Sequence, residues 1–236
     1  MIAIYKGNEP EGLTLLRQSS SADGLSPKEA YKRLKKPLKA QVRQCLVDEQ
    51  GGLCAYCMCK IPRSDVNPLI TPIIIEHIIP RDPDDGRDVG QGLDYNNLLA
   101  VCHGNKDIHG SRKFADLTCD AHRENTEFRK INPCKPETLA SIIYSLNGKI
   151  DATYHDVKFD LVDTLNLNCP SSPLIAERKS ALDHLIAGLG ILPETDILDY
   201  CTAALCEFRA ETNPRTPYVG ILMWYLESMI SSLSTT

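Results

Sequence analysis

With 236 residues and an ordinary 42% of hydrophobic residues, this chain can bury one good core with flanking layers. No apolar run approaches the roughly 20 residues of a membrane helix, and the first residues lack the pattern of a signal peptide. The net charge of −5 argues against a protein that coats nucleic acid on its own. We therefore expect one elaborated, soluble domain in the cytoplasm, with no membrane partner.

Two helices are expected in the N-terminal region, residues 1–52. Ser26 followed by Pro27 and Glu29 forms a capping box with proline at the first helical position, which predicts a helix start. Pro37 should end this helix. The apolar spacing after it predicts a second helix that ends before two consecutive glycines.

The same region carries a run of basic side chains, while residues 2–5 suggest at most a short strand. The basic run consists of Lys28, Lys32, Arg33, Lys35, Lys36, Lys39 and Arg43. A local patch of this kind can outweigh a negative net charge and contact phosphate. A solvated helix face explains the same pattern equally well.

Ten cysteines would suggest disulfides in a short secreted chain, but a close-spaced pair in a reducing cytoplasm more often holds metal. Cys54 and Cys57 have the spacing that lets one turn supply two thiolates to tetrahedral zinc. Cys102 and Cys119 are the candidates for the other two ligands. The competing ligands are Cys59, Cys134 and His103. The thiols expected to be inert core residues are Cys45, Cys169, Cys201 and Cys206.

Between the two cysteine pairs, residues 73–75 are three isoleucines, and their β-branched side chains predict a buried strand. The strand ends in Glu76 and His77, which as neighbours on a strand point to opposite faces. Alone, this pair is most simply a surface glutamate beside a satisfied histidine. Only the residues that surround this pair in the sequence indicate a function for it.

After the cysteine region, Asn147 and Gly148 lie between two apolar runs and predict a hairpin with a tight turn. The remainder of the chain predicts a helical layer. Its last helix, from Pro217, is apolar over more than one stripe, so it either packs within the chain or meets a partner. We expect it to pack within the chain.

Two spacings tie the acid–histidine pair to the cysteines: Asn97 lies five residues before Cys102, and Asp120 follows Cys119 directly. With Glu76 and His77, these residues resemble the HNH endonuclease family, which has a ββα-metal core with a zinc-cysteine frame. The resemblance implies that His77 is the general base, oriented by Asn97. It also implies that Glu76 and Asp120 bind a catalytic Mg²⁺ or Mn²⁺, beside the structural Zn²⁺ of Cys54, Cys57, Cys102 and Cys119.

The chain departs from the family pattern at two positions. Glu76 stands where the family usually has aspartate, and Asp120 stands where it has asparagine or histidine. His122 or Asn125 could therefore replace Asp120, while Arg123 would contact phosphate. The segment between Cys102 and Cys119 is longer than usual and is either a substrate loop or a surface loop. Its polar residues include His103, Lys106, His109 and Arg112.

Motifs across most of the chain resemble the PtuB-type HNH nucleases of Septu and retron anti-phage systems. They are residues 5–10, 54–57, 76–80, 95–99, 147–150 and 165–168. The resemblance implies a toxic effector that acts on DNA or RNA, such as tRNA, together with a PtuA-type ATPase. In retrons the partners also include a reverse transcriptase and its RNA-linked DNA.

The expected fold class is α+β. An N-terminal, mainly helical region (1–52) precedes an HNH nuclease core (53–135), and a hairpin with C-terminal helices (136–236) would dock the partner. A second hypothesis is a catalytically inactive, zinc-stabilised subunit that binds nucleic acid or acts as a scaffold. Only the enzyme needs His77, so that residue separates the two hypotheses. A thiol oxidoreductase would need its CxxC at a helix start within a β–α–β pattern, which is not evident here.

Overall fold

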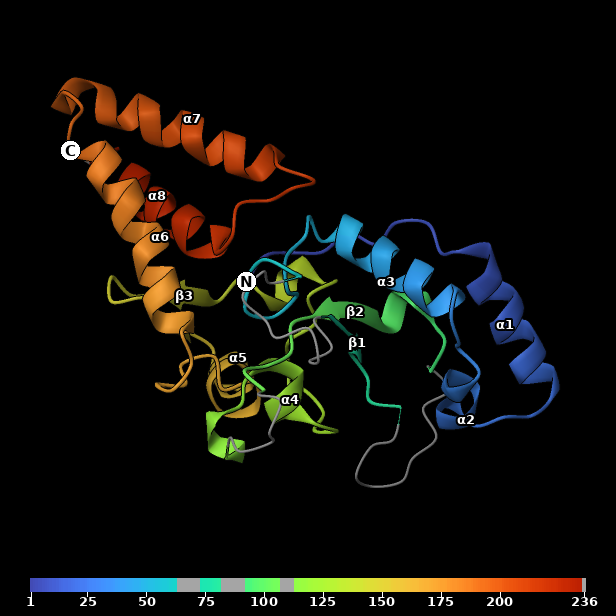
Figure 1. The fold of residues 1–236 in the computed structure, drawn as a ribbon. Coiled ribbons are helices and arrows are strands. Elements are labelled where there is room, and N and C mark those ends of the chain that lie inside the picture. Colours follow the sequence, from blue (N-terminus) through green and yellow to red (C-terminus); the bar gives the residue numbers. More distant parts are fainter. Residues whose placement is uncertain (63–72, 82–91, 107–112, 235–236) are drawn as a thin grey trace.

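A computed structural model describes residues 1–62, 73–81, 92–106 and 113–234, and these form a mixed α+β architecture. Figure 1 shows the N-terminal helices at one end of the molecule and the C-terminal helices at the other, with a small sheet between them. In the described residues, one buried core includes side chains from all three regions of the chain. The expected α+β class is confirmed.

The N-terminal region contains α1 (Glu11–Ala22), α2 (Pro27–Lys32) and α3 (Leu38–Glu49). The expected capping box is present, since Ser26 Oγ accepts from the Glu29 amide and the Glu29 carboxylate accepts from the Ser26 amide. Helix α1 was not expected, and residues 2–5 form no strand. Instead, the Ile4 amide donates to the Pro133 carbonyl at 2.9 Å.

The central sheet pairs β1 (Ile74–His77) with β2 (Leu98–Val101) in antiparallel register, with Glu76 opposite Leu99. All four residues of β2 are buried, and α3 packs against this strand. The short helix α4 (Cys119–Arg123) follows next among the main elements. The buried sheet thus presents the Glu76 and His77 positions at the end of β1.

A second sheet pairs β3 (Ile142–Tyr144) with β4 (Ile150–Ala152) around the expected Asn-Gly turn. Gly148 has a φ of +86°, and a Cβ at this position would lie 2.3 Å from the Ile175 carbonyl oxygen. The turn therefore needs glycine both for its backbone conformation and for the close approach of α6 (Leu174–Leu189).

The chain then forms α5 (His155–Phe159) and a π-helical turn (Asp160–Thr164). The Asp160 carboxylate is fully buried and accepts from the backbone amides of residues 129, 130 and 131 at 2.8 to 2.9 Å. These charge-assisted bonds satisfy the buried carboxylate. They also hold the segment after α4 against the π-helical turn.

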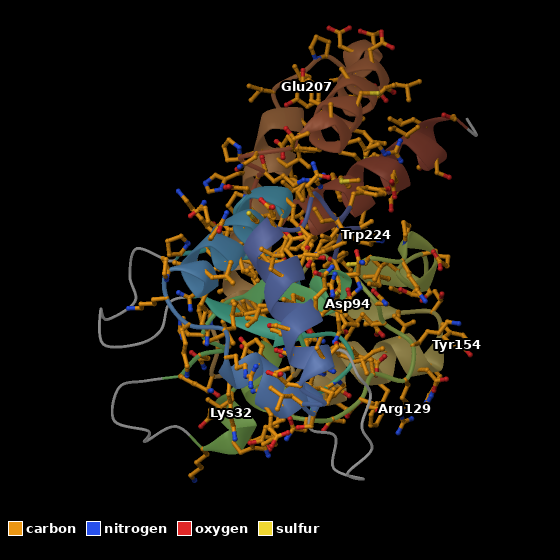
Figure 2. All side chains as sticks on the ribbon, turned by 90° about the vertical axis from the view of Figure 1, so that its right-hand side faces the viewer. Lys32, Asp94, Arg129, Tyr154, Glu207 and Trp224 are labelled. Atoms are coloured by element: carbon orange, nitrogen blue, oxygen red, sulfur yellow. The ribbon has the colours of Figure 1, made fainter. Side chains whose placement is uncertain are left out.

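Three helices complete the chain: α6 (Leu174–Leu189), α7 (Ile197–Ala210) and α8 (Val219–Leu233). Helix α8 packs on both α6 and α7, so its broad apolar surface is used largely within the chain, as expected. Figure 2 shows Glu207 of α7 at the end of the molecule opposite Lys32 of α2. Among the described helices, none combines the length and apolar character needed to cross a membrane.

Candidate functional site

Four buried cysteine thiols converge where the loop before β1, the end of β2 and the start of α4 meet. The Sγ atoms of Cys54, Cys57, Cys102 and Cys119 all lie within 4.8 Å of one another. The Cys57–Cys102 and Cys102–Cys119 Sγ distances are 3.8 and 3.7 Å. Zinc bonded tetrahedrally to sulfur at about 2.3 Å requires sulfur atoms about 3.8 Å apart. The cluster therefore fits structural zinc, with the four ligands that the sequence predicted.

The electrostatics of the cluster favour a cation. Burial opposes ionisation of the Cys54 thiol, but hydrogen bonds from the Cys102 and Cys119 thiols outweigh it and hold the Cys54 pKa well below its usual value. Hydrogen bonds from the same two thiols lower the pKa of Cys57 to about 6. The hydrogen bond with Cys102, together with burial, raises the pKa of Cys119. A divalent cation would allow all four to ionise together.

The competing ligands are not part of the four-cysteine set. Cys59 is buried beside it and interacts with its thiols, whereas Cys134 is half-buried near Lys6. Of the thiols expected to lie in the core, Cys169 and Cys201 are buried and Cys45 is half-buried. The expectation was wrong for Cys206, which is exposed on α7.

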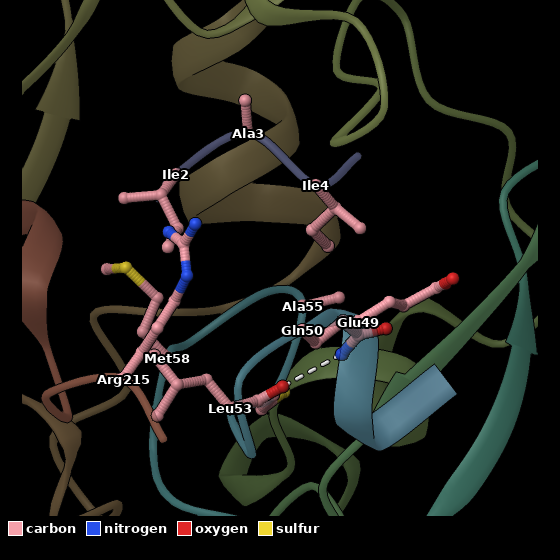
Figure 3. A pocket seen from close by; sticks show the side chains of 10 residues that line it. Ile2, Ala3, Ile4, Glu49, Gln50, Leu53, Ala55, Met58 and Arg215 are labelled. Atoms are coloured by element: carbon pink, nitrogen blue, oxygen red, sulfur yellow. Dashed lines mark hydrogen bonds between the residues drawn. The ribbon is translucent and has the colours of Figure 1, made fainter. Parts of the chain in front are cut away.

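A buried glutamine that the sequence did not single out braces the first cysteine loop. Gln50 Nε2 donates to the carbonyls of Leu53 (2.8 Å) and Ala100 (2.7 Å), and its Oε1 accepts from the Ala100 amide at 2.8 Å. Figure 3 shows the Gln50–Leu53 bond at the edge of a small cavity. The cavity measures about 10 Å³, which is too small for any organic ligand. Gln50 thus joins the loop to β2.

Leu165 and Asn166 hold the segment that carries Cys119, the fourth cysteine. Asn166 Nδ2 donates to the carbonyls of Ala115 and Leu117, both at 2.9 Å, and the Cys119 amide donates to the Leu165 carbonyl. A Cβ at Gly104, whose φ is +64°, would lie 2.3 Å from the Thr118 carbonyl oxygen. Asn166 belongs to a motif noted in the sequence, so its position was visible there but its contacts were not.

The structure brings together the two carboxylates predicted to bind a cation. Glu76 of β1 is 6% exposed, and Asp120 of α4 lies near enough for its charge to raise the pKa of Glu76. Burial raises the pKa of Glu76 to about 8; Arg123 opposes this shift, and the charge of Asp120 adds to it. Tyr56 and Arg123 both donate to Glu76 Oε1, which leaves Oε2 for Asp120 or a cation.

The expectation that Arg123 contacts phosphate is not what the structure shows. Its side chain is 1% exposed and forms an ion pair with Glu76. It also donates to the backbone carbonyls of His77 at 2.8 Å, Ile78 at 2.7 Å and Thr126 at 2.8 Å. A guanidinium has five donors, and these contacts use it to join α4 to the end of β1.

His77 is 5% exposed, and its ring is fixed on two sides. Nε2 lies 2.9 Å from the Gly92 carbonyl oxygen, and the ring meets Tyr31 edge to face at a centroid distance of 4.8 Å. A carbonyl only accepts, so Nε2 carries the hydrogen and Nδ1 carries the lone pair. Burial lowers the pKa of His77 to about 4, which keeps the imidazole neutral near pH 7.

Asn97 does not bind the His77 ring in the contacts seen here, contrary to the role implied by the resemblance. Its Oδ1 accepts from the Ile79 amide at 2.8 Å and its Nδ2 donates to the Ile79 carbonyl at 2.9 Å. The Asn97 carbonyl also accepts from the Ile78 amide. Asn97 therefore fixes the backbone that follows His77, and the Gly92 carbonyl orients the ring.

Of the alternatives to Asp120, His122 turns away from the carboxylates. Its Nδ1 bonds the Thr164 carbonyl at 3.0 Å and its ring stacks on Phe114 at 4.4 Å. Asn125 is exposed. The geometry therefore favours Asp120 as the partner of Glu76. His109 and Arg112, considered for a substrate loop, lie outside the described residues.

Comparison with protein-family models gives no match for this chain, and comparison with curated proteins gives none either. The interpretation of the site therefore depends on its geometry and chemistry.

Proposed function

We propose that this chain is a metal-dependent endonuclease of the HNH type that hydrolyses phosphodiester bonds in DNA or RNA. The observation that carries the proposal is the approach of Asp120 to Glu76, from segments far apart in sequence, with a neutral His77 as the next residue of β1. The antiparallel β1–β2 pair, the following α4 and the four-cysteine cluster support it, because they have the order expected of a ββα-metal core.

Each residue then has a role that phosphodiester hydrolysis requires. His77 would accept the proton of the attacking water at Nδ1, because Nε2 faces the Gly92 carbonyl. Glu76 and Asp120 supply the oxygen ligands that Mg²⁺ or Mn²⁺ prefers. A divalent cation bound there stabilises the charge that develops on the phosphate and on the leaving oxygen. Arg123 holds the two carboxylate-bearing segments together.

We further propose, from the resemblance alone, that the nuclease is the effector of a Septu or retron anti-phage complex. Its partner would be a PtuA-type ATPase, joined in a retron by the reverse transcriptase and its RNA-linked DNA. Co-purification of the tagged chain with the neighbouring ATPase tests this part separately. If the chain cleaves nucleic acid but never associates with that ATPase, the nuclease proposal stands and the proposed ATPase partner is ruled out.

The test of the enzyme compares wild type, His77→Ala and a matched control, His184→Ala, whose histidine is exposed on α6. Plasmid DNA and total cellular RNA are incubated with each protein, alone and with the ATPase, with and without added Mg²⁺. We expect Mg²⁺-dependent cleavage that falls by about 10²- to 10⁴-fold in His77→Ala and is unchanged in His184→Ala. Equal cleavage by His77→Ala and wild type would contradict the proposal.

One observation favours a second candidate function. Glu76 is already paired with a buried arginine, as it would be in a zinc-stabilised binding or scaffold subunit that performs no chemistry. Such a subunit would bind nucleic acid or the ATPase with the same affinity whether position 77 is histidine or alanine. Binding without any Mg²⁺-dependent cleavage in the assay above would favour this second function.

A further inference from the structure

Two cationic side chains contact one tyrosine ring next to His77, and a third lies one turn further along the same helix. Lys39 Nζ lies 5.1 Å and Arg81 Cζ lies 4.6 Å from the centroid of the Tyr31 ring. The charge of Arg43, one turn after Lys39 on α3, acts on both Lys39 and Tyr31. Two segments, α3 and the residues after β1, therefore bring positive charge to one place.

This cation cluster, defined as Lys39, Arg43 and Arg81, is not neutralised within the described part of the chain. No carboxylate there forms an ion pair with any of the three, and the buried Nε of Arg43 has no hydrogen-bond partner. Burial, followed by the charges of Arg43 and Arg81, lowers the pKa of Lys39. The cluster therefore costs free energy as it stands, and an anion would relieve that cost.

Three other cations at the same end of the molecule are paired with carboxylates. Lys6 pairs with Glu49 of α3, Arg17 of α1 pairs with Glu9, and Arg33 pairs with Asp23. The region thus has carboxylates available, but none of those in the described segments forms an ion pair with the cation cluster. A solvated helix face does not account for a buried guanidinium nitrogen without a partner.

The position of the cluster relates it to the candidate catalytic residues. Tyr31, which contacts two of the cations, also meets the His77 ring at 4.8 Å. Burial raises the pKa of Tyr31; Arg81 and Arg43 act against this shift, while Glu76 and Asp120 add to it. Tyr31 therefore lies between two of the cations and the His77 ring.

We propose that Lys39, Arg43 and Arg81 bind backbone phosphates of a nucleic-acid strand, adjacent to the phosphodiester that is attacked by the water that His77 deprotonates. Phosphodiesters carry one negative charge per nucleotide, and guanidinium groups match their oxygens with two parallel hydrogen bonds. The inference deepens the proposed function and rests on it. It identifies the ligand as the phosphate backbone, read without regard to base sequence.

Binding is measured in the full-length His77→Ala chain, so that no cleavage occurs, by fluorescence anisotropy without added Mg²⁺. The probes are DNA and RNA oligonucleotides of one sequence, each tested single-stranded and as a duplex. Binding is measured at salt concentrations from about 50 to about 200 mM, where the release of counterions changes the affinity. The added changes are Lys39→Gln, Arg43→Gln and Arg43→Lys. Lys36→Gln is the matched control, because Lys36 is exposed on the same basic stretch. Melting temperature and zinc content verify folding.

We expect Lys39→Gln and Arg43→Gln each to weaken binding and to reduce the slope of log affinity against log salt by about 1. Arg43→Lys should keep most of the slope, and Lys36→Gln should change it little. The probe bound best identifies the substrate class. Binding by folded Lys39→Gln and Arg43→Gln that matches Lys36→Gln would overturn the inference, as would the absence of measurable binding to every probe.

The two proposals fail in different ways. If the slopes change as expected but the chain with His77 intact never cleaves, the phosphate site stands and the nuclease does not. If cleavage depends on His77 while Lys39→Gln and Arg43→Gln bind and cleave like Lys36→Gln, the nuclease stands and the phosphate site does not.

Discussion

The four-cysteine cluster and the Glu76–His77–Asp120 group both join distant segments, but they differ in the completeness of their ligands. The cysteines, Glu76 and His77 are buried, whereas Asp120 is half-buried. The cluster offers four identical soft ligands at tetrahedral spacing, with no position left for water or substrate. The second group offers two carboxylates, one of them already paired with Arg123, next to a neutral imidazole.

The difference indicates two purposes. A complete set of thiolates fixes zinc for folding, because no coordination position remains for chemistry. An incomplete set of oxygen ligands leaves positions for a weakly held cation and its substrate. The changes below test this contrast, beginning with the largest expected effect.

The largest effect is expected from Cys54→Ser. Zinc contributes on the order of 10 kcal/mol to the folding of small zinc-dependent domains. This contribution equals or exceeds the whole free energy of unfolding of many domains, which is about 5–15 kcal/mol. The variant should lose bound zinc and its cooperative thermal transition, measured by metal analysis and circular dichroism. Cys206→Ser, the same change at an exposed thiol, should alter neither. A Cys54→Ser chain with normal zinc and melting would contradict the structural-zinc assignment.

A smaller but substantial loss is expected from Arg123→Met. Arg123 donates to the Glu76 carboxyl group and to three backbone carbonyls, and removing these buried bonds without replacing the donor costs about 3–5 kcal/mol. Urea denaturation measures the loss. Arg209→Met breaks an exposed pair with Glu227 and should cost about 1 kcal/mol or less. Equal losses in the two variants would show that Arg123 does not hold α4 to β1. Adding Glu76→Gln to Arg123→Met should recover part of the stability.

The pH dependence of Mg²⁺ binding separates the carboxylate pair from the thiols. Because the pKa of Glu76 is raised from 4.5 to about 8, the folded chain holds a proton there that the unfolded chain has released. Stability of the Mg²⁺-free protein should therefore fall as pH rises between these values. Cation binding expels the proton, so Mg²⁺ affinity should increase up to about tenfold per pH unit below pH 8.

Calorimetric titration with Mg²⁺ at pH 6, 7 and 8 in zinc-loaded protein measures this dependence. Glu76→Gln should bind Mg²⁺ weakly and without the dependence on pH. If the Mg²⁺ affinity of the unmodified chain does not change with pH, the pKa of Glu76 is not raised.

The smallest effect is expected from Cys59→Ser. This thiol is buried beside the cluster but is not one of its four ligands. We expect retention of one zinc per chain and a loss of about 1 kcal/mol, typical of a single core substitution. Loss of zinc comparable to that of Cys54→Ser would make Cys59 a ligand and would break the distinction drawn above.

Local signals predicted the local structure well. The Ser26–Glu29 capping box, the Asn147–Gly148 turn and the start of α8 after Pro217 depend on neighbouring residues, and each was found. Helix α1 was missed because it buries little besides Leu13 and lacks a side-chain cap, so neither periodicity nor a capping motif marked it.

For the site, residue type and spacing predicted the four cysteines, because a tetrahedral thiolate site has few solutions. Residue type did not predict what Arg123 or Asn97 would contact. Arg123 is buried only because α4 packs beside the end of β1, which is a property of the tertiary fold. Gln50 carried no signal at all, since its three backbone contacts depend on the approach of β2.

Cys119 and Asp120 are consecutive residues at the start of α4, so one short helix carries both a zinc ligand and a candidate Mg²⁺ ligand. A newly synthesised chain without zinc would have no fixed place for Asp120 and hence no carboxylate pair. Zinc loading would thus act as a maturation step that delays the proposed cleavage activity until folding is complete. In a refolding time course, cleavage should appear only after zinc has been taken up, and the supply of zinc should set the delay.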